Sequence, residues 1–152
     1  MGCSTSYFDW NCEDIFLRNT NTKNTKKFIP NITRGRVIKV YDGDTITVAA
    51  RLDRRGKIYK FNVRLNRIDA PEMKSNNRDE KIAAIAAKEA LSGKILNKCI
   101  TLDNVSVEKY GRVLADIHYR NLCLNDWMLS EKYAVIYDGG TKSTINWKNY
   151  RK

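Results

Sequence analysis

The stretch RLNRIDAPE, from Arg64 to Glu72, brings an arginine and two carboxylates to the end of one expected strand. Asp69 and Glu72 flank Ala70 and Pro71, and a proline fixes its own φ and biases the residue before it toward extended backbone. The two acids should therefore stand on a stiff corner, which suits a metal or phosphate site. For an isolated D-x-P-E, the favoured interpretation is still a surface strand that ends in a charged turn.

Further carboxylates and a second arginine occur at other expected strand ends. Asp44 follows Gly43 in a first hairpin, and Arg112 stands at the start of a late strand. Carboxylates are hard ligands that suit Ca²⁺ or Mg²⁺, and a planar guanidinium pairs bidentately with phosphate oxygens. This combination predicts phosphodiester chemistry. Asp42 is expected only to shape the turn, because Asp before Gly is common in hairpins for backbone reasons.

Hydrophobic periodicity predicts the elements that would position these groups. Asn76 or Asn77 can cap the first expected helix, with Glu80 placed as in a capping box, and Asn121 or Asn125 can cap the second. The segments are two strands within 32–52, strands at 58–65, 98–107 and 112–119, and helices over 82–96 and 124–133. The pattern predicts an α+β, mainly β fold: a five-stranded barrel of the oligonucleotide-binding (OB) type with one main helix and one or two shorter helices. Beyond Gly140 the pattern is at most weakly helical.

The charge of the chain bounds its partners. The 152 residues fit one domain with tails, and the formal net charge is +11. From Ile32 onward there are 24 basic and 14 acidic residues, so the expected domain is itself basic. Such a surface favours a polyanion, with nucleic acid first and an anionic membrane second, although a merely basic soluble protein is an alternative. No protein partner is predicted.

The cysteines do not predict a zinc site, because they show no C-x-x-C spacing and His118 is the one histidine in the sequence. His118, on an alternating strand, is expected to be a structural or surface residue. No secretory apolar stretch opens the chain, which favours an intracellular, reducing setting. Cys99 and Cys123 are expected to be buried thiols.

Residues 1–30 carry mixed polar and charged residues without a sustained period, which predicts a flexible arm before a domain over 31–152. The arm begins with MGCSTS, which matches the pattern for myristoylation of Gly2, with Cys3 placed for palmitoylation. In a eukaryotic cell this would hold the protein at the cytoplasmic face of a membrane. A chance match on a disordered start is the alternative.

Three motifs occur in one order and in the expected elements: DGDT at 42–45, R-L-x-x-I-D-x-P-E at 64–72 and KYGR at 109–112. Together they resemble the staphylococcal-nuclease-like, or thermonuclease, family over Ile32–Tyr137. The resemblance implies a Ca²⁺-dependent endonuclease that hydrolyses single-stranded or flexible DNA and RNA to 3′-phosphate and 5′-hydroxyl products. A non-catalytic nucleic-acid-binding module of the same fold and a membrane-tethered adaptor are the alternatives. The retained arginines and carboxylates favour the enzyme.

The resemblance also implies roles for individual residues. Asp44 and Asp69 match the calcium-binding carboxylates of the family, and Ala70 stands where a backbone carbonyl completes the site. Glu72 matches the general base. The residues implied to hold the scissile phosphate are Arg64 and Arg112, and those implied to contact a terminal nucleotide phosphate are Lys109 and Tyr110.

Two features depart from the family pattern. The segment between Glu72 and the expected helix is shorter than the mobile loop of some members, so substrate access can differ. Tyr137 lies where relatives place aromatic residues that stack on a base, which makes it a candidate nucleotide contact. A packed or half-exposed tyrosine at a strand end is an equally supported interpretation.

Overall fold

The first three strands are β1 (Arg34–Val40), β2 (Thr45–Arg51) and β3 (Ile58–Leu65). Apolar residues alternate in β2 and β3, whereas β1 buries Val37 and Val40 on either side of a register shift. The structure is a computed structural model that describes residues 17–140 and 145–150. Strands β1, β2 and β3 form an antiparallel meander, in which Thr45 at the start of β2 pairs with Arg64 near the end of β3. The predicted hairpin at the DG pair is therefore present, and it puts Asp44 close to Arg64.

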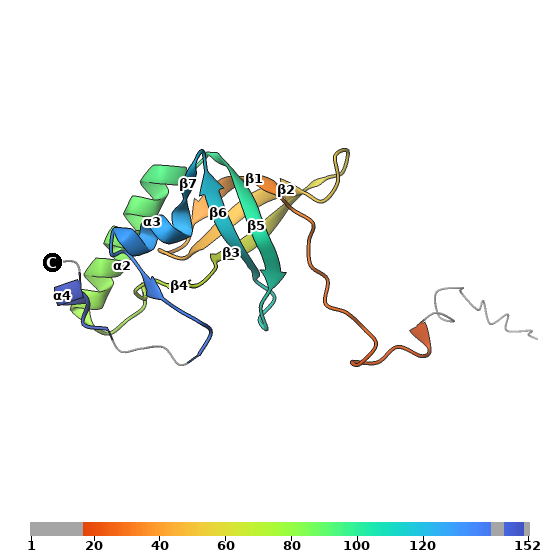
Figure 1. The fold of residues 1–152 in the computed structure, drawn as a ribbon, viewed down its shortest axis with the longest axis horizontal. Coiled ribbons are helices and arrows are strands. Elements are labelled where there is room, and N and C mark those ends of the chain that lie inside the picture. The colour runs from red at the N-terminus through yellow and green to blue at the C-terminus, as the bar shows by residue number, and fades with distance from the viewer. Residues whose placement is uncertain (1–16, 141–144, 151–152) are drawn as a thin grey trace, which may run out of the picture.

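Two later strands close the barrel. Strand β5 (Cys99–Val107) pairs antiparallel with both β1 and β6 (Val113–Tyr119). Strand β6 also pairs in parallel with β3, so that, in the part of the chain that the structure describes, five strands form a closed barrel. Figure 1 shows the barrel with the helices gathered at one end. The predicted mainly β, OB-type fold is confirmed.

Short strands attach the segments that surround the barrel. Strand β4 (Ile68–Asp69) pairs antiparallel with β8 (Val135–Ile136), and β7 (Leu122–Cys123) pairs with the end of β6. The β4–β8 pair holds the residues that follow β3 against the segment that leads to Tyr137. Parts of the chain nearly seventy residues apart therefore meet beside the end of β3.

The main helix, α2 (Arg78–Ile95), begins four residues before the predicted start. The Asn77 side chain caps it by accepting hydrogen bonds from the N–H groups of Asp79 and Glu80. Ala87, Leu91 and Ile95 on one side of the helix are buried in the core of the barrel, and Ala83 and Ala84 are buried nearer its start. This packing explains why the Ala-rich segment forms a helix although its apolar stripe is narrow.

The second predicted helix is α3 (Leu124–Ser130), which is shorter than expected and is not capped by Asn121 or Asn125. Cys123 is the N-cap residue, without a side-chain hydrogen bond. Asn125 lies inside the helix, where its Oδ1 accepts a hydrogen bond from the N–H of Ile117 in β6. The predicted cap was wrong because this amide instead satisfies backbone groups of the barrel. The weak C-terminal pattern forms a short helix, α4 (Trp147–Tyr150), with Trp147 buried.

The predicted burial of Cys99 is wrong. Cys99 begins β5 and is exposed, whereas the neighbouring Ile100 is buried. Because successive side chains of a strand point to opposite faces, the inward position of Ile100 turns Cys99 outward. Cys123 is half-buried, and burial raises the pKa of its thiol.

The N-terminal predictions fall largely on residues that the structure leaves undescribed. Gly2 and Cys3 lie outside the described residues, so their acylation stays a prediction. Residues 17–29 are exposed, and the buried core begins with Pro30 and Ile32. Among the helices of the described ranges, none has the length and apolar character needed to cross a membrane.

Candidate active site

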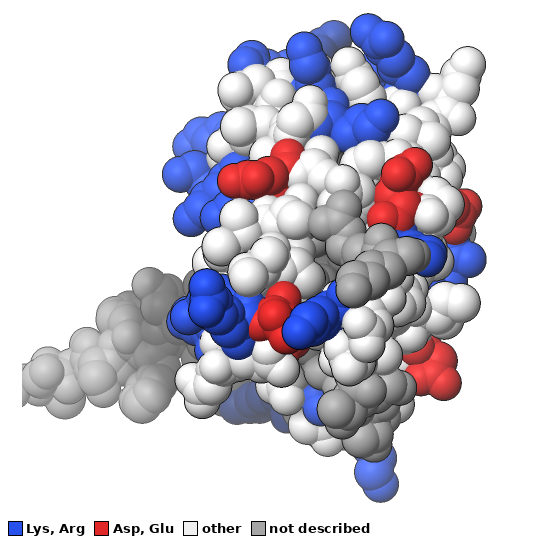
Figure 2. Space-filling model, turned by 90° about the vertical axis from the view of Figure 1, so that its left-hand side faces the viewer, with Lys and Arg blue, Asp and Glu red and all other residues white. Residues whose placement is uncertain are grey.

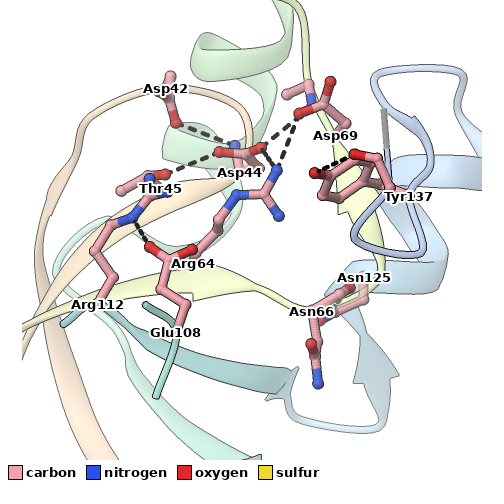
Figure 3. A network of polar contacts seen from close by, with 12 residues as sticks. Asp42, Asp44, Thr45, Arg64, Asn66, Asp69, Glu108, Arg112, Asn125 and Tyr137 are labelled. Carbon is pink, nitrogen blue, oxygen red and sulfur yellow. Dashed lines mark hydrogen bonds and ion pairs between the residues drawn. The ribbon is translucent and has the colours of Figure 1, made fainter. Parts of the chain in front are cut away.

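Asp44, Arg64 and Asp69 form a nearly buried cluster at one end of the barrel. The Arg64 Nη2 atom lies 2.9 Å from Asp44 Oδ2 and 3.0 Å from Asp69 Oδ1. The three side chains are between 9% and 13% exposed. Figure 3 shows the two carboxylates converging on the guanidinium. The structure thus brings together three residues that the sequence predicted for one site.

The close approach of Asp44 to this corner depends on the glycine before it. A Cβ atom on Gly43 would lie 2.8 Å from the Cβ of Ala70 and 2.9 Å from the Cβ of Ala87, which is too close for any side chain. The turn therefore packs directly on the corner and on α2. The N–H of Ala70 donates to Asp44 Oδ2 at 3.3 Å, and the Thr45 hydroxyl donates to Asp44 Oδ1 at 2.8 Å. These contacts fix the orientation of the Asp44 carboxylate.

Burial dominates the electrostatics of Asp44. It raises the pKa of this carboxyl from 3.8 to about 6, although the Arg64 guanidinium opposes the shift and the charge of Asp42 adds to it. Asp42 also accepts a hydrogen bond from the Asp44 N–H at 3.3 Å, as expected of a turn-forming aspartate. A buried carboxylate of this kind gains from further positive charge nearby.

Arg112 is oriented by Glu108, a residue that was missed in the sequence. The KYGR turn is closed by hydrogen bonds between the backbone groups of Glu108 and Arg112 and by Gly111, whose φ of +82° is a left-handed conformation that suits glycine. The turn places the Glu108 carboxylate on the Nε of Arg112. This hydrogen bond is the main reason that the pKa of Arg112 is raised. The four-residue spacing of acid and arginine was the available signal.

Glu72 stands on a turn that is held by Glu80. The Glu72 N–H donates to Glu80 Oε1 at 3.2 Å, and the Ser75 hydroxyl donates to Glu80 Oε2 at 2.6 Å. The expected capping box is not formed, because the N–H of Asn77 donates to the Ser75 hydroxyl instead. The short segment between the corner and α2 brings the Glu72 backbone within reach of this carboxylate. Glu80 therefore holds the backbone of Glu72, the predicted base, and does not complete a capping box with Asn77.

A cleft of about 660 Å³ opens in front of this cluster. Tyr137 stands at its edge, with the Arg64 guanidinium 5.4 Å from the centre of its ring and its hydroxyl donating to the Gly140 carbonyl at 2.9 Å. Asp69 is paired with Arg64 but does not itself line the cleft. The predicted site residues that line the cleft are Asp44, Arg64, Ala70, Glu72, Lys109, Tyr110, Arg112 and Tyr137.

The charge in the cleft is nearly balanced although the chain is strongly basic. Its described lining residues include five carboxylates (Asp42, Asp44, Glu72, Glu108 and Asp138) and four cations (Arg64, Arg67, Lys109 and Arg112). On the face seen in Figure 2, by contrast, several groups of basic side chains lie among uncharged residues, with fewer acidic ones between them. The basic excess therefore lies outside the cleft, and the cleft itself needs added positive charge to hold a polyanion well.

Asp44 and Asp69 supply some, but not all, of the oxygen ligands that a hard cation would need. Within residues 17–140 and 145–150, no three or more His, Cys, Asp or Glu side chains are grouped so that they could hold a metal ion. Asp44 and Asp69 nevertheless present oxygens that converge on one nitrogen atom. Oxygen donors are those that Ca²⁺ and Mg²⁺ prefer, and both ions complete their shells with water, backbone or phosphate oxygens. Ala70 lies beside Asp44, which it contacts through its N–H.

Comparison with known proteins places this chain among nucleases of the same kind as the sequence motifs suggested. The family model described as "Staphylococcal nuclease homologue" matches residues 62–151, which is more than half of the chain. An uncharacterized endonuclease of Haemophilus influenzae is 33% identical over 67% of this chain and 51% of its own length. A probable endonuclease of Schizosaccharomyces pombe is 31% identical over 52% of the chain and 37% of its own length. An uncharacterized endonuclease of Escherichia coli is 29% identical over 68% of the chain and 61% of its own length.

The chain thus spans between 37% and 61% of the length of these three relatives. The family match begins within β3 and covers the corner at Asp69, the KYGR turn and α3. Asp44 lies before the matched range and is joined to it by its ion pair with Arg64. With the barrel, the cleft and this match in agreement, the chain belongs to the staphylococcal nuclease homologue family.

Proposed function

We propose that this chain is a divalent-cation-dependent nuclease that hydrolyses phosphodiester bonds of DNA and RNA, with Ca²⁺ as the preferred ion. The observation that carries the proposal is the convergence of Asp44 and Asp69 on Arg64, beside a cleft that Asp44 and Arg64 line together with Glu72 and Arg112. Family membership and relatives named as endonucleases support the same reaction class. A non-catalytic binding module has no need of this set of charged groups.

The two arginines would act on the phosphate. Attack of water on a phosphodiester builds negative charge on the non-bridging oxygens, and guanidiniums aimed at those oxygens stabilise the transition state more than the substrate. Arg112 is already oriented by Glu108. Arg64 lies in the same cleft, held by Asp44 and Asp69. One donor of this kind is typically worth roughly 10²–10³ in rate.

A bound divalent ion at Asp44 and Asp69 would supply positive charge to a phosphate oxygen and lower the pKa of a nearby water. The Glu72 carboxylate, on the turn that Glu80 holds, would accept the proton of the attacking water. Bond cleavage on the side of the 5′-oxygen would leave a 3′-phosphate and a 5′-hydroxyl. This direction follows from the family resemblance.

Aromatic and basic residues around the cleft would hold the nucleotides. Tyr110 is 75% exposed, with the Lys109 ammonium 4.9 Å from the centre of its ring, which suits contact with a terminal phosphate. Tyr137, on the other side, offers a ring for stacking on a base. Base stacking on an aromatic side chain contributes about 1–3 kcal/mol and tolerates any base. These contacts need unpaired bases, so we propose single-stranded or flexible regions as the substrate.

The decisive experiment is digestion of single-stranded DNA and RNA with Ca²⁺, with Mg²⁺ and with chelator. We expect the fastest cleavage with Ca²⁺, none with chelator, and a loss of activity in Asp44→Ala and in Glu72→Gln. The products should carry 3′-phosphates. Full activity in chelator would refute the metal assignment, and unchanged turnover of a folded Glu72→Gln protein would remove Glu72 as the base.

A further inference from the structure

Arg67 lies in the tight turn between β3 and β4, has an unfavourable backbone conformation and lines the cleft. Its φ is 60°, a left-handed conformation that glycine adopts freely and that costs free energy for an arginine. No turn requirement explains an arginine here. Its side chain is 63% exposed, and the residue lines the same cleft as Arg64 and Arg112. An arginine kept at a strained position inside a substrate cleft points to a function of its side chain.

The backbone on both sides of Arg67 is held firmly. The Asn66 N–H donates to the Ala115 carbonyl at 2.9 Å, and the Asn66 carbonyl accepts from the Asn125 amide at 2.9 Å. Figure 3 shows Asn125 beside Asn66, below Tyr137. The Tyr137 N–H donates to the Arg67 carbonyl at 2.9 Å. The Cα of Arg67 is therefore fixed relative to β6, α3 and β8.

The guanidinium is aimed by a buried acid. Arg67 Nη2 lies 3.4 Å from Asp116 Oδ1, and the Asp116 side chain is only 8% exposed. Asp116 is itself held by the amides of Asn104, at 2.6 Å, and Asn125, at 3.3 Å. This ion pair engages one nitrogen of the guanidinium. The exposed remainder of the planar group can still donate to an anion in the cleft.

We propose that Arg67 forms a second phosphate-binding subsite, which holds a phosphate next to the scissile one in a polynucleotide strand. Three residues of chain span at most about 11 Å, so Arg67 lies close to Arg64 in the same cleft. The two guanidiniums are held by different acids, Arg67 by Asp116 and Arg64 by Asp44 and Asp69. The subsite rests on the proposed function, because it needs the scissile phosphate at Arg64 and Arg112. It goes beyond that function by making a strand with several phosphates a better ligand than a single phosphodiester.

The experiment compares Arg67→Gly with Arg120→Gly. Arg120 has the same left-handed φ, 57°, in the turn between β6 and β7 at the other end of β6, and it is also exposed. Both changes remove one arginine and relieve the same backbone strain, so they are matched in net charge and local conformation. Arg67→Asn, a residue that also tolerates positive φ, provides a second variant. Thermal unfolding checks that each variant folds.

The probe is a fluorescently labelled single-stranded DNA twelve-mer, and binding is measured by anisotropy in Ca²⁺ over a range of salt concentrations. A Glu72→Gln background prevents cleavage during the measurement. We expect Arg67→Gly to weaken binding about threefold to tenfold and to reduce the slope of log K against log salt by about 0.7, the value for one lost phosphate contact on a single strand. Arg120→Gly should change neither. With a dinucleoside monophosphate, which has one phosphodiester, Arg67→Gly should have no effect.

Equal affinities and equal salt slopes for Arg67→Gly and Arg120→Gly would overturn the subsite, and so would an absence of salt-dependent binding in the parent protein. Failure of the proposed function is separate. A wild-type protein that does not cleave, but whose binding depends on Arg67 and not on Arg120, would refute the nuclease while supporting the subsite. Normal cleavage with no dependence of binding on Arg67 would support the nuclease and refute the subsite.

Discussion

Replacing Arg64 by methionine tests, by a measurement of thermal stability, how much the ion pairs of Arg64 with Asp44 and Asp69 contribute to folding. The change removes the guanidinium that both Asp44 and Asp69 contact, and it keeps a long apolar stem in place. Removing one partner of a buried ion pair costs about 3–5 kcal/mol, because it leaves an uncompensated charge. For a chain of this length, 1 kcal/mol corresponds to roughly 2–4 °C in Tm. We therefore expect Tm to fall by about 10 °C at pH 8 in chelator.

The pH dependence of this deficit has a definite sign. The pKa of Asp44 is about 6 in the folded protein, above its ordinary value of 3.8, and Arg64 keeps it from rising further. A carboxyl whose pKa is raised by folding contributes stability below its unfolded pKa and loses that contribution as pH rises through its folded pKa. Without Arg64 the pKa of Asp44 should rise above 6. The deficit of Arg64→Met should then be smaller at pH 5, where Asp44 is mostly protonated and the lost contact to Asp69 accounts for what remains, than at pH 8.

The matched control is Arg112→Met in the same cleft. Its ion pair with Glu108 lies within one turn and its side chain is 38% exposed, so the loss should be at most about 1 kcal/mol. Thermal unfolding followed by circular dichroism at pH 5 and pH 8 gives all the values. Millimolar Ca²⁺ should recover part of the Arg64→Met deficit at pH 8, because an ion that binds only the folded state stabilises it. A deficit no larger than that of Arg112→Met, or one that is equal at both pH values, would refute the reasoning.

Three further predictions concern other parts of the chain. Glu80→Gln keeps the shape of the side chain but removes its charge and replaces one of the two oxygens that accept from the Glu72 N–H and the Ser75 hydroxyl with a donor NH₂ group, so kcat should fall severalfold more than KM rises; equal kcat in the variant and the wild type would show that Glu80 does not position the base. An alkylating reagent at pH 8 should modify exposed Cys99 faster than half-buried Cys123, whose pKa is raised by burial, and peptide mass spectrometry would show the reverse order if this is wrong. In a eukaryotic cell, a fusion with the native N-terminus should associate with membranes and lose that association in Gly2→Ala; a fusion that is indifferent to the change would show that MGCSTS is a chance match.

The strands and the corner could be predicted because their signals are local. Period-two alternation sets the faces of β2 and β3, and the DG pair sets the register that places Asp44 opposite the end of β3. Proline at position 71 fixes the corner without help from the rest of the fold. The same local rule could also have found the exposure of Cys99, since Ile100 beside it is apolar and faces the core.

The roles of Glu80 and Asn125 could not be predicted, because each depends on which of several partners comes within reach. Glu80 could serve the Asn77 N–H or the Glu72 N–H, and the short connection before α2 decides for Glu72. Asn125 occupies a position where an amide can cap a helix. Its choice of Ile117 and Asn66 depends on the packing of α3 against β6, which no sequence pattern contains.

The basic residues that can attract a polyanion and the charged residues of the cleft lie in different parts of this protein. The excess of basic residues lies outside the cleft and acts over a Debye length of about 10 Å at 0.1 M salt, so it can draw a polyanion to the surface but is weakened by salt. The cleft carries nearly equal numbers of carboxylates and cations, and its most buried acid, Asp44, has a raised pKa. A phosphate that enters the cleft therefore meets repulsion from acids as well as attraction from arginines. The carboxylates would be a disadvantage for a protein that only binds nucleic acid, and they become useful when a divalent ion accompanies the phosphate.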